Sequence, residues 1–282
     1  MDQHDGGHSA NPAMAGMDWE VLDVVVVLLL GVGALVYALG LWAARGRSPW
    51  PLRRTLFWYV GIGCVAAGLL GPVAQAAHTS FTAHMLGHLL LGMIAPLLMV
   101  LGAPITLAMR ALPAVAARRL SRLLRSAWIR GLTHPVIAAT LNAGGLWLLY
   151  TTELFHMMHA SAAVYALVHL HLFAAGYLLT ASLIGPDPDP HRASMPVRSA
   201  VLVLFIAAHS ILAKWLFAHP PQGVEPADGR AGAQLMYYGG DVVDVTLIVL
   251  LFAGWYAATR PRTSRSRGSA RADDHETRGA RA

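Results

Sequence analysis

Two histidines stand four residues apart in a stretch that is otherwise apolar enough for lipid. They are His84 and His88, within "TSFTAHMLGHLLLGMIAPLL" at residues 79–98. Residues four apart share one face of a helix, so both imidazoles point the same way. Burying an imidazole in hydrocarbon without a partner costs roughly several kcal/mol. The role of this pair therefore depends on which other polar groups lie at the same depth.

Titratable residues recur in three later apolar stretches. They are His169, His171, His209, Asp241 and Asp244. Counted at about 1.5 Å per residue, all of them lie roughly 6 to 15 Å below one membrane surface, as His84 and His88 do. His169 and His171 are about 200° apart around a helix and cannot both face one centre, so one of them has another role. The two aspartates are three residues apart and share a face.

A bound cation would satisfy several of these groups at once. The sequence therefore predicts a metal site made by His84, His88, His169, His171, His209, Asp241 and Asp244. Copper suits imidazole, and zinc would accept the same donors. Haem b held by two histidines and a bundle that conducts protons or divalent cations are the alternatives, and each histidine alone could simply hydrogen-bond a carbonyl. The single cysteine, Cys64, excludes cysteine-based metal sites and disulfides.

Further soft or basic groups could support this site. Those within the apolar stretches are Met85, Met93, Met236 and Lys214. The lysine either extends its ammonium to the interface or pairs with an aspartate. Two segments outside the stretches predict secondary copper capture, through His4, His8, Met14 and Met17 near the N-terminus and through His156, Met157, Met158 and His159. Thioethers favour Cu(I).

The elements that must position these groups are membrane helices. The chain has 282 residues, is 56% hydrophobic and only 13% charged. Seven apolar stretches are each near the 20 residues that cross a bilayer: 20–43, 55–73, 80–102, 134–153, 161–184, 197–218 and 234–258. The predicted fold is an all-α polytopic bundle. The net charge of +6 does not indicate nucleic acid, because the basic residues stand between apolar spans.

The arginines predict the orientation of the bundle. They gather in segments 45–54, 110–130, 192–198 and 260–281, whereas the alternate connections hold only Arg230. Cationic loops stay in the cytoplasm, so the N-terminus is expected outside and the C-terminus inside. That arrangement needs an odd number of spans, which agrees with seven.

Three segments lie outside the spans. Residues 1–19 are expected to form a flexible arm outside the cell, 20–258 the membrane domain, and 259–282 a disordered basic tail in the cytoplasm. Residues 112–132 mix apolar residues with five arginines at roughly helical spacing. This pattern is equally compatible with a helix that lies on anionic headgroups and with a loop whose arginines only fix the orientation of the neighbouring spans.

Several motifs resemble one known family. They are "HMLGHLLLGMIAPLLMVLGAPITL" (84–107), "HP" at 134, "HLHLFAAGYL" (169–178), "IGPDPDP" (184–190), His209 and "QLMYYGGDVVD" (234–244). Their order and spacing resemble the multi-pass CtaG family of cytochrome c oxidase assembly factors, in particular its actinobacterial members. The resemblance implies a non-enzymatic protein of the bacterial plasma membrane that handles copper for a haem-copper oxidase and contacts the oxidase subunits. The motif match carries over His84, His88, His169, His171, His209 and Asp241.

Overall fold

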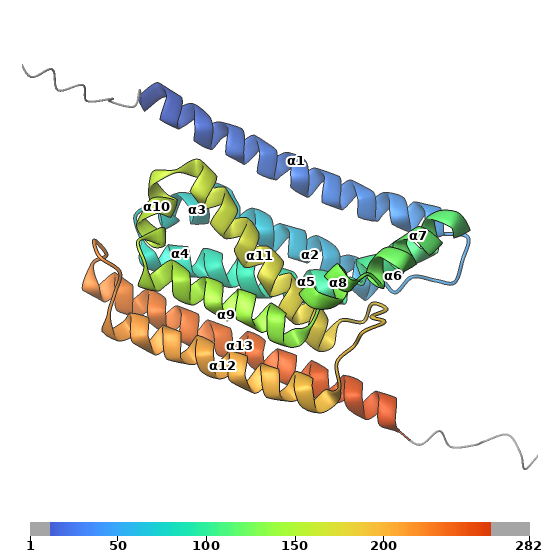
Figure 1. The fold of residues 1–282 in the computed structure, drawn as a ribbon. Coiled ribbons are helices and arrows are strands. Elements are labelled where there is room, and N and C mark those ends of the chain that lie inside the picture. Colours follow the sequence, from blue (N-terminus) through green and yellow to red (C-terminus); the bar gives the residue numbers. More distant parts are fainter. Residues whose placement is uncertain (1–11, 261–282) are drawn as a thin grey trace, which may run out of the picture.

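The structure is a computed structural model that describes residues 12–260, with side chains from residue 18 onward. Figure 1 shows the described chain as helices that run alongside one another, and it contains no strand. The helices are α1 (Pro12–Ala44), α2 (Leu52–Leu69), α3 (Gly71–Ala77), α4 (Phe81–His88), the π-helix η1 (Leu89–Ile94), α5 (Ala95–Leu101), α6 (Pro104–Ala111), α7 (Ala114–Leu124), α8 (Ala127–Leu132), α9 (Pro135–Thr151), α10 (Leu154–Ala160), α11 (Ala162–Ile184), α12 (Met195–Ala218) and α13 (Pro226–Thr259). The all-α prediction is confirmed.

Six segments of the described chain are long and apolar enough to cross a membrane. They are 18–44, 52–77, 81–111, 162–184, 195–218 and 226–259. The remaining predicted span is α9, whose 17 residues extend about 25 Å, at the short end of what a bilayer needs. Seven spans and their orientation stay a prediction. The start of α1 and the end of α13 lie at opposite ends of the bundle in Figure 1, as an odd number of spans requires.

Two helices begin before their predicted starts at residues 20 and 234. Proline occupies the first position of both α1 and α13, where its fixed φ suits a helix and its missing N–H costs nothing. The Glu225 side chain also accepts a hydrogen bond from the backbone N–H of Asp228 at 2.9 Å and caps α13. Met14 and Met17 lie within the bounds of α1, and the flexible arm stays a prediction. His4, His8 and the tail beyond Arg260 lie outside the described residues.

The third predicted span holds the centre of the bundle. Helices α4, η1 and α5 form one continuous rod, in which η1 inserts a wider turn directly after His88. The rod breaks at Gly102 and Ala103, where Ala103 has a φ of 51°, and α6 starts again at Pro104. The Asp187 carboxylate accepts from the backbone N–H of Thr106 at 2.7 Å and from its hydroxyl at 2.6 Å. The Tyr37 hydroxyl donates to the Gly102 carbonyl at 2.9 Å.

Small residues let α11 approach this rod. A Cβ on Gly176 would collide with the Gly92 carbonyl and would lie 3.1 Å from Pro96 Cγ. The sequence predicts that the stripe through Gly92 and Pro96 admits a neighbouring helix, and α11 is that helix. This close packing brings the histidines of α11 toward those of α4.

Helices are present between residues 112 and 132, so this segment is not an irregular loop. Its apolar side chains Val115, Leu123 and Trp128 are 56%, 58% and 84% exposed. Figure 1 shows α6, α7 and α8 at one end of the bundle and α3 and α10 at the other. We call these the arginine end and the histidine end.

Candidate functional site

Two histidines from different helices face each other inside the bundle. The rings of His88 on α4 and His209 on α12 have centroids 6.2 Å apart and planes 23° apart. Both side chains are buried, with 3% and 2% of their surface exposed. Neither ring nitrogen of His88, nor Nε2 of His209, has a hydrogen-bond partner among the described residues. We call His88 and His209 the buried pair.

A glycine of α13 makes room for the buried pair. A Cβ on Gly240 would lie 2.5 Å from Cε1 of His209. Asp244 is one helical turn further along α13, is 2% exposed, and neither of its carboxylate oxygens has a hydrogen-bond partner in the described chain. Asp241 is only half-buried. The two predicted aspartates therefore differ, and Asp244 is the one enclosed by protein.

Closer to the histidine end, His84 lies among aromatic rings. Its Nε2 and the Tyr150 hydroxyl are hydrogen-bonded at 3.0 Å. The His84 ring centroid lies 5.9 Å from that of His159 on α10, which in turn lies 6.2 Å from that of His78. Phe155 packs edge-on against His84.

His169 faces the same region from α11. Its Nδ1–H donates to the Tyr165 carbonyl at 2.8 Å, and its ring stacks on the Tyr165 ring with centroids 3.9 Å apart. The other face of the region is closed by Trp19 of α1, which contacts both His78 and Tyr165 edge-on at 5.3 Å. We call His78, His84, His159 and His169 the outer group.

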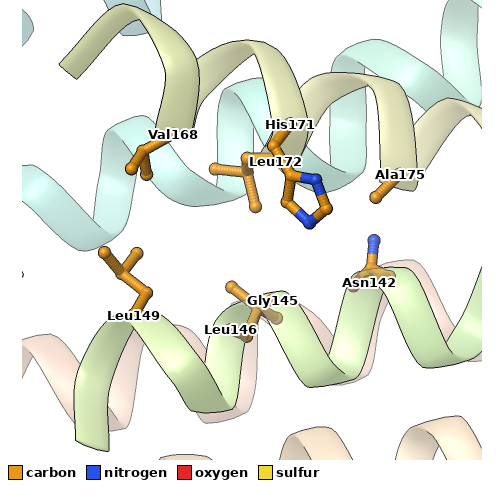
Figure 2. Close-up of a pocket in the computed structure, with 8 residues that line it drawn as sticks. All are labelled: Asn142, Gly145, Leu146, Leu149, Val168, His171, Leu172 and Ala175. Atoms are coloured by element: carbon orange, nitrogen blue, oxygen red, sulfur yellow. The ribbon is translucent and has the colours of Figure 1, made fainter. Parts of the chain in front are cut away.

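His171 lies apart from the other histidines. Figure 2 shows its ring between α11 and α9, close to Asn142 and over Gly145. Its ring nitrogen Nε2 lies 3.1 Å from the Leu141 carbonyl, and the absence of a side chain on Gly145 makes room for the ring. The two rings therefore contact different helices: His169 bonds within α11, whereas His171 joins α11 to α9. The metal-binding roles of both residues stay predictions.

Some of the predicted supporting residues are buried in the bundle and others are exposed. In the segment 156–159, Met158 is fully buried and His159 faces the outer group, whereas His156 and Met157 are exposed, so these four do not form one cluster. Met85 and Met236 are fully buried, with the Met85 sulfur 3.8 Å from the Tyr150 hydroxyl. Lys214 is exposed, and its ammonium lies 5.1 Å from the centre of the Tyr237 ring.

Within residues 12–260, no three His, Cys, Asp or Glu side chains are placed to hold one metal ion. The predicted convergence of all seven residues on a single cation is therefore not met. The side chains fall into the outer group and the buried pair with Asp244. Hydrogen bonds explain part of this division, because Tyr150, Tyr165 and Leu141 each hold one imidazole in place.

Sequence reasoning missed two residues that position the site. Tyr150 ends an apolar stretch and nothing in its surroundings marks it as a partner of His84. Asp228 accepts hydrogen bonds from the backbone N–H groups of Phe81 at 2.6 Å and Thr82 at 3.1 Å, so α13 caps the start of α4. The motif "EPAD" at 225–228, an acidic residue before a helix-starting proline, was the available signal.

Comparisons with known proteins identify the family to which this chain belongs. The family described as "Cytochrome c oxidase caa3 assembly factor (Caa3_CtaG)" matches residues 35–258. An uncharacterized protein of Mycobacterium bovis is 32% identical over 193 residues, which cover 66% of this chain and 28% of that protein. An uncharacterized protein of Mycobacterium leprae is 26% identical over 253 residues, which cover 80% and 38%. The chain thus spans about a third of these curated relatives, and no solved structure matches it.

Proposed function

Because this chain belongs to the family of cytochrome c oxidase caa3 assembly factors, we propose that it binds copper at the buried pair and delivers the metal to the oxidase. Its subunit partners are those of the oxidase, and it resides in the bacterial plasma membrane. The histidine end faces outward and the arginine end lies in the cytoplasm, as the positive-inside rule requires. Helices α7 and α8 then rest on anionic headgroups through their exposed apolar side chains and arginines.

One observation carries this proposal: buried polar atoms without partners. Imidazole nitrogens and a carboxylate that stay unbonded in a protein interior each cost roughly 1–3 kcal/mol or more. A copper ion held by His88 and His209 would satisfy a nitrogen on each ring, and imidazole is among the ligands that copper prefers. The buried Asp244 carboxylate would balance the charge of the ion.

Haem b is the alternative occupant of the buried pair. A haem between two axial histidines needs a cavity of roughly several hundred Å³. A single ion between two imidazoles needs far less room. An absorption spectrum of the purified protein tests this point, because bound haem would give a Soret band.

Copper retention by purified variants tests the proposal. We expect His88→Ala to lower the copper content of the detergent-purified protein, measured by elemental analysis, because it removes one of the two unbonded imidazoles. His171→Ala is the matched control, since it removes a membrane-embedded imidazole that faces Leu141 instead of the buried pair. It should retain copper as the wild type does.

The result is read from both variants together. Unchanged copper in a triple variant with alanine at His84, His88 and His209 would reject the copper site. Retention should also fall in acid, because protons compete with copper for the imidazole nitrogens. A cation flux through proteoliposomes without stored copper would instead support the conducting bundle.

A further inference from the structure

Five imidazoles form a row from the surface of the histidine end to the buried pair. In order they are His78, His159, His84, His88 and His209, which we call the imidazole row. Exposure falls along it: His78 is exposed, His159 half-buried, and the last three are 7%, 3% and 2% exposed. Neighbouring ring centroids lie 6.2, 5.9 and 6.2 Å apart at the three steps between helices. The remaining step joins His84 and His88, which lie about one turn apart on the same face of α4.

The spacing suits an ion shared between neighbouring rings. Nitrogen ligands bind first-row metal ions at about 2 Å. Two imidazoles that each point an in-plane nitrogen at one ion from opposite sides therefore have centroids about 6 Å apart. The three steps between different segments are of this size.

Hydrogen bonds also decide which nitrogens can bind a metal. A backbone carbonyl only accepts, so the 2.8 Å bond from His159 to the Phe155 carbonyl places the hydrogen on Nδ1 and the lone pair on Nε2. Bonds of this kind fix the tautomer of metal-binding histidines. Tyr150 can donate or accept, so His84 presents an Nδ1 lone pair whenever the hydroxyl accepts from its Nε2. His88 has both nitrogens unbonded within the described chain.

The surroundings of the row leave a cation few other ligands. Trp19 and Tyr165 pack against His78, and Phe81 and Phe155 pack against His84. Among these apolar walls the Met85 thioether is one further soft donor, buried beside the Tyr150 hydroxyl. A soft cation that enters here binds imidazole or thioether at every position, which favours Cu(I).

We propose that the imidazole row is the route by which Cu(I) reaches the buried pair. The ion moves by ligand exchange, in which each neutral ring offers a lone pair to an ion that the previous ring still holds. No proton or electron is transferred in these steps. This inference rests on the proposed function, because it assigns the route to the same copper site.

The kinetics of copper loading test the route. The copper-free full chain, in detergent, is mixed with the coloured Cu(I) complex of bicinchoninate, and loss of colour reports the uptake of Cu(I). We expect His159→Asn to slow loading by about tenfold and to leave the final copper content unchanged. This substitution keeps a donor at the Nδ1 position for the Phe155 carbonyl and removes the Nε2 lone pair. His156→Asn is the control, because His156 is exposed on the same helix, outside the row.

The outcomes separate the two proposals. Loading of His159→Asn at the wild-type rate overturns the route while the buried pair stands. A loss of final copper as large as that in His88→Ala also overturns it, because His159 would then belong to the storage site itself. A wild-type chain that takes up no Cu(I) overturns both proposals. Gel filtration and the unfolding temperature check that His159→Asn is folded; if it is not, the exposed His78→Ala takes its place with the same expectation.

Discussion

At the scale of the residue, Gly240 leaves free the space that the His209 ring occupies. We expect Gly240→Ala to displace the His209 ring, because the new methyl group would lie 2.5 Å from Cε1. Loss of this support should weaken copper retention by about tenfold, which elemental analysis after dialysis measures. Gly254→Ala is the control on the same helix, where a Cβ meets nothing within 4 Å and where alanine stabilises a helix by up to about 1 kcal/mol. Equal copper in the two variants would contradict the assignment.

Residue types and spacing predicted a large part of the candidate site. The i, i+4 spacing of His84 and His88 and the opposed directions of His169 and His171 both follow from helix geometry alone. Which of the latter two faces the site does not, because it depends on the rotation of α11 about its own axis. That rotation is set by the close packing of Gly176 on Gly92 and by the space above Gly145, which are contacts between distant segments.

At the scale of the element, Asp228 joins the start of α13 to the start of α4. Its carboxylate also accepts from the hydroxyl groups of Ser80 at 3.1 Å and Thr82 at 2.6 Å. We expect Asp228→Ala to lower the free energy of unfolding by about 1–3 kcal/mol, because a helix cap and several hydrogen bonds to a charged group are lost together. Thermal unfolding in detergent measures this change. Glu225→Ala, which removes only the cap on Asp228, should cost less; an equal loss would contradict the role given to Asp228.

The ends of α11 and α12 could be predicted from the sequence because each apolar stretch ends close to where its helix ends. The predicted spans 161–184 and 197–218 differ from α11 and α12 by no more than two residues. The π-turn after His88 and the early start of α13 were not predictable from hydropathy. Both depend on backbone hydrogen bonds, and apolar composition carries no information about those.

At the scale of the whole molecule, the predicted orientation can be tested by labelling introduced cysteines, because the chain has only one native cysteine to replace. With Cys64 replaced by serine, we expect a membrane-impermeant thiol reagent to label Gln222→Cys in intact cells and Arg119→Cys only after permeabilisation. Both positions are exposed, one between α12 and α13 and the other on α7, at opposite ends of the bundle. Labelling in the reverse pattern would overturn the outward placement of the histidine end and the route from that side.

Arginine placement predicts an orientation for the bundle, and it carries no information about how few contacts α1 makes with the other helices. Only 6% of the apolar window of α1 is buried, and Figure 1 shows α1 set apart from the other helices along much of its length. Hydropathy cannot distinguish a helix that faces lipid from one enclosed by other helices, because lipid and protein interior are equally apolar.

The interruption at Gly102 and Ala103 explains how so exposed a helix stays attached. In an unbroken helix the Gly102 carbonyl would accept from the Thr106 N–H, but Thr106 donates to Asp187 and the carbonyl is taken by Tyr37. Two hydrogen bonds thus replace one lost backbone bond: the first attaches α1 to the end of the rod that carries His84 and His88, and the second attaches the 185–194 loop to the start of α6. A movement of α1 or of the 185–194 loop would therefore displace the backbone where the rod ends, at Gly102 and Ala103.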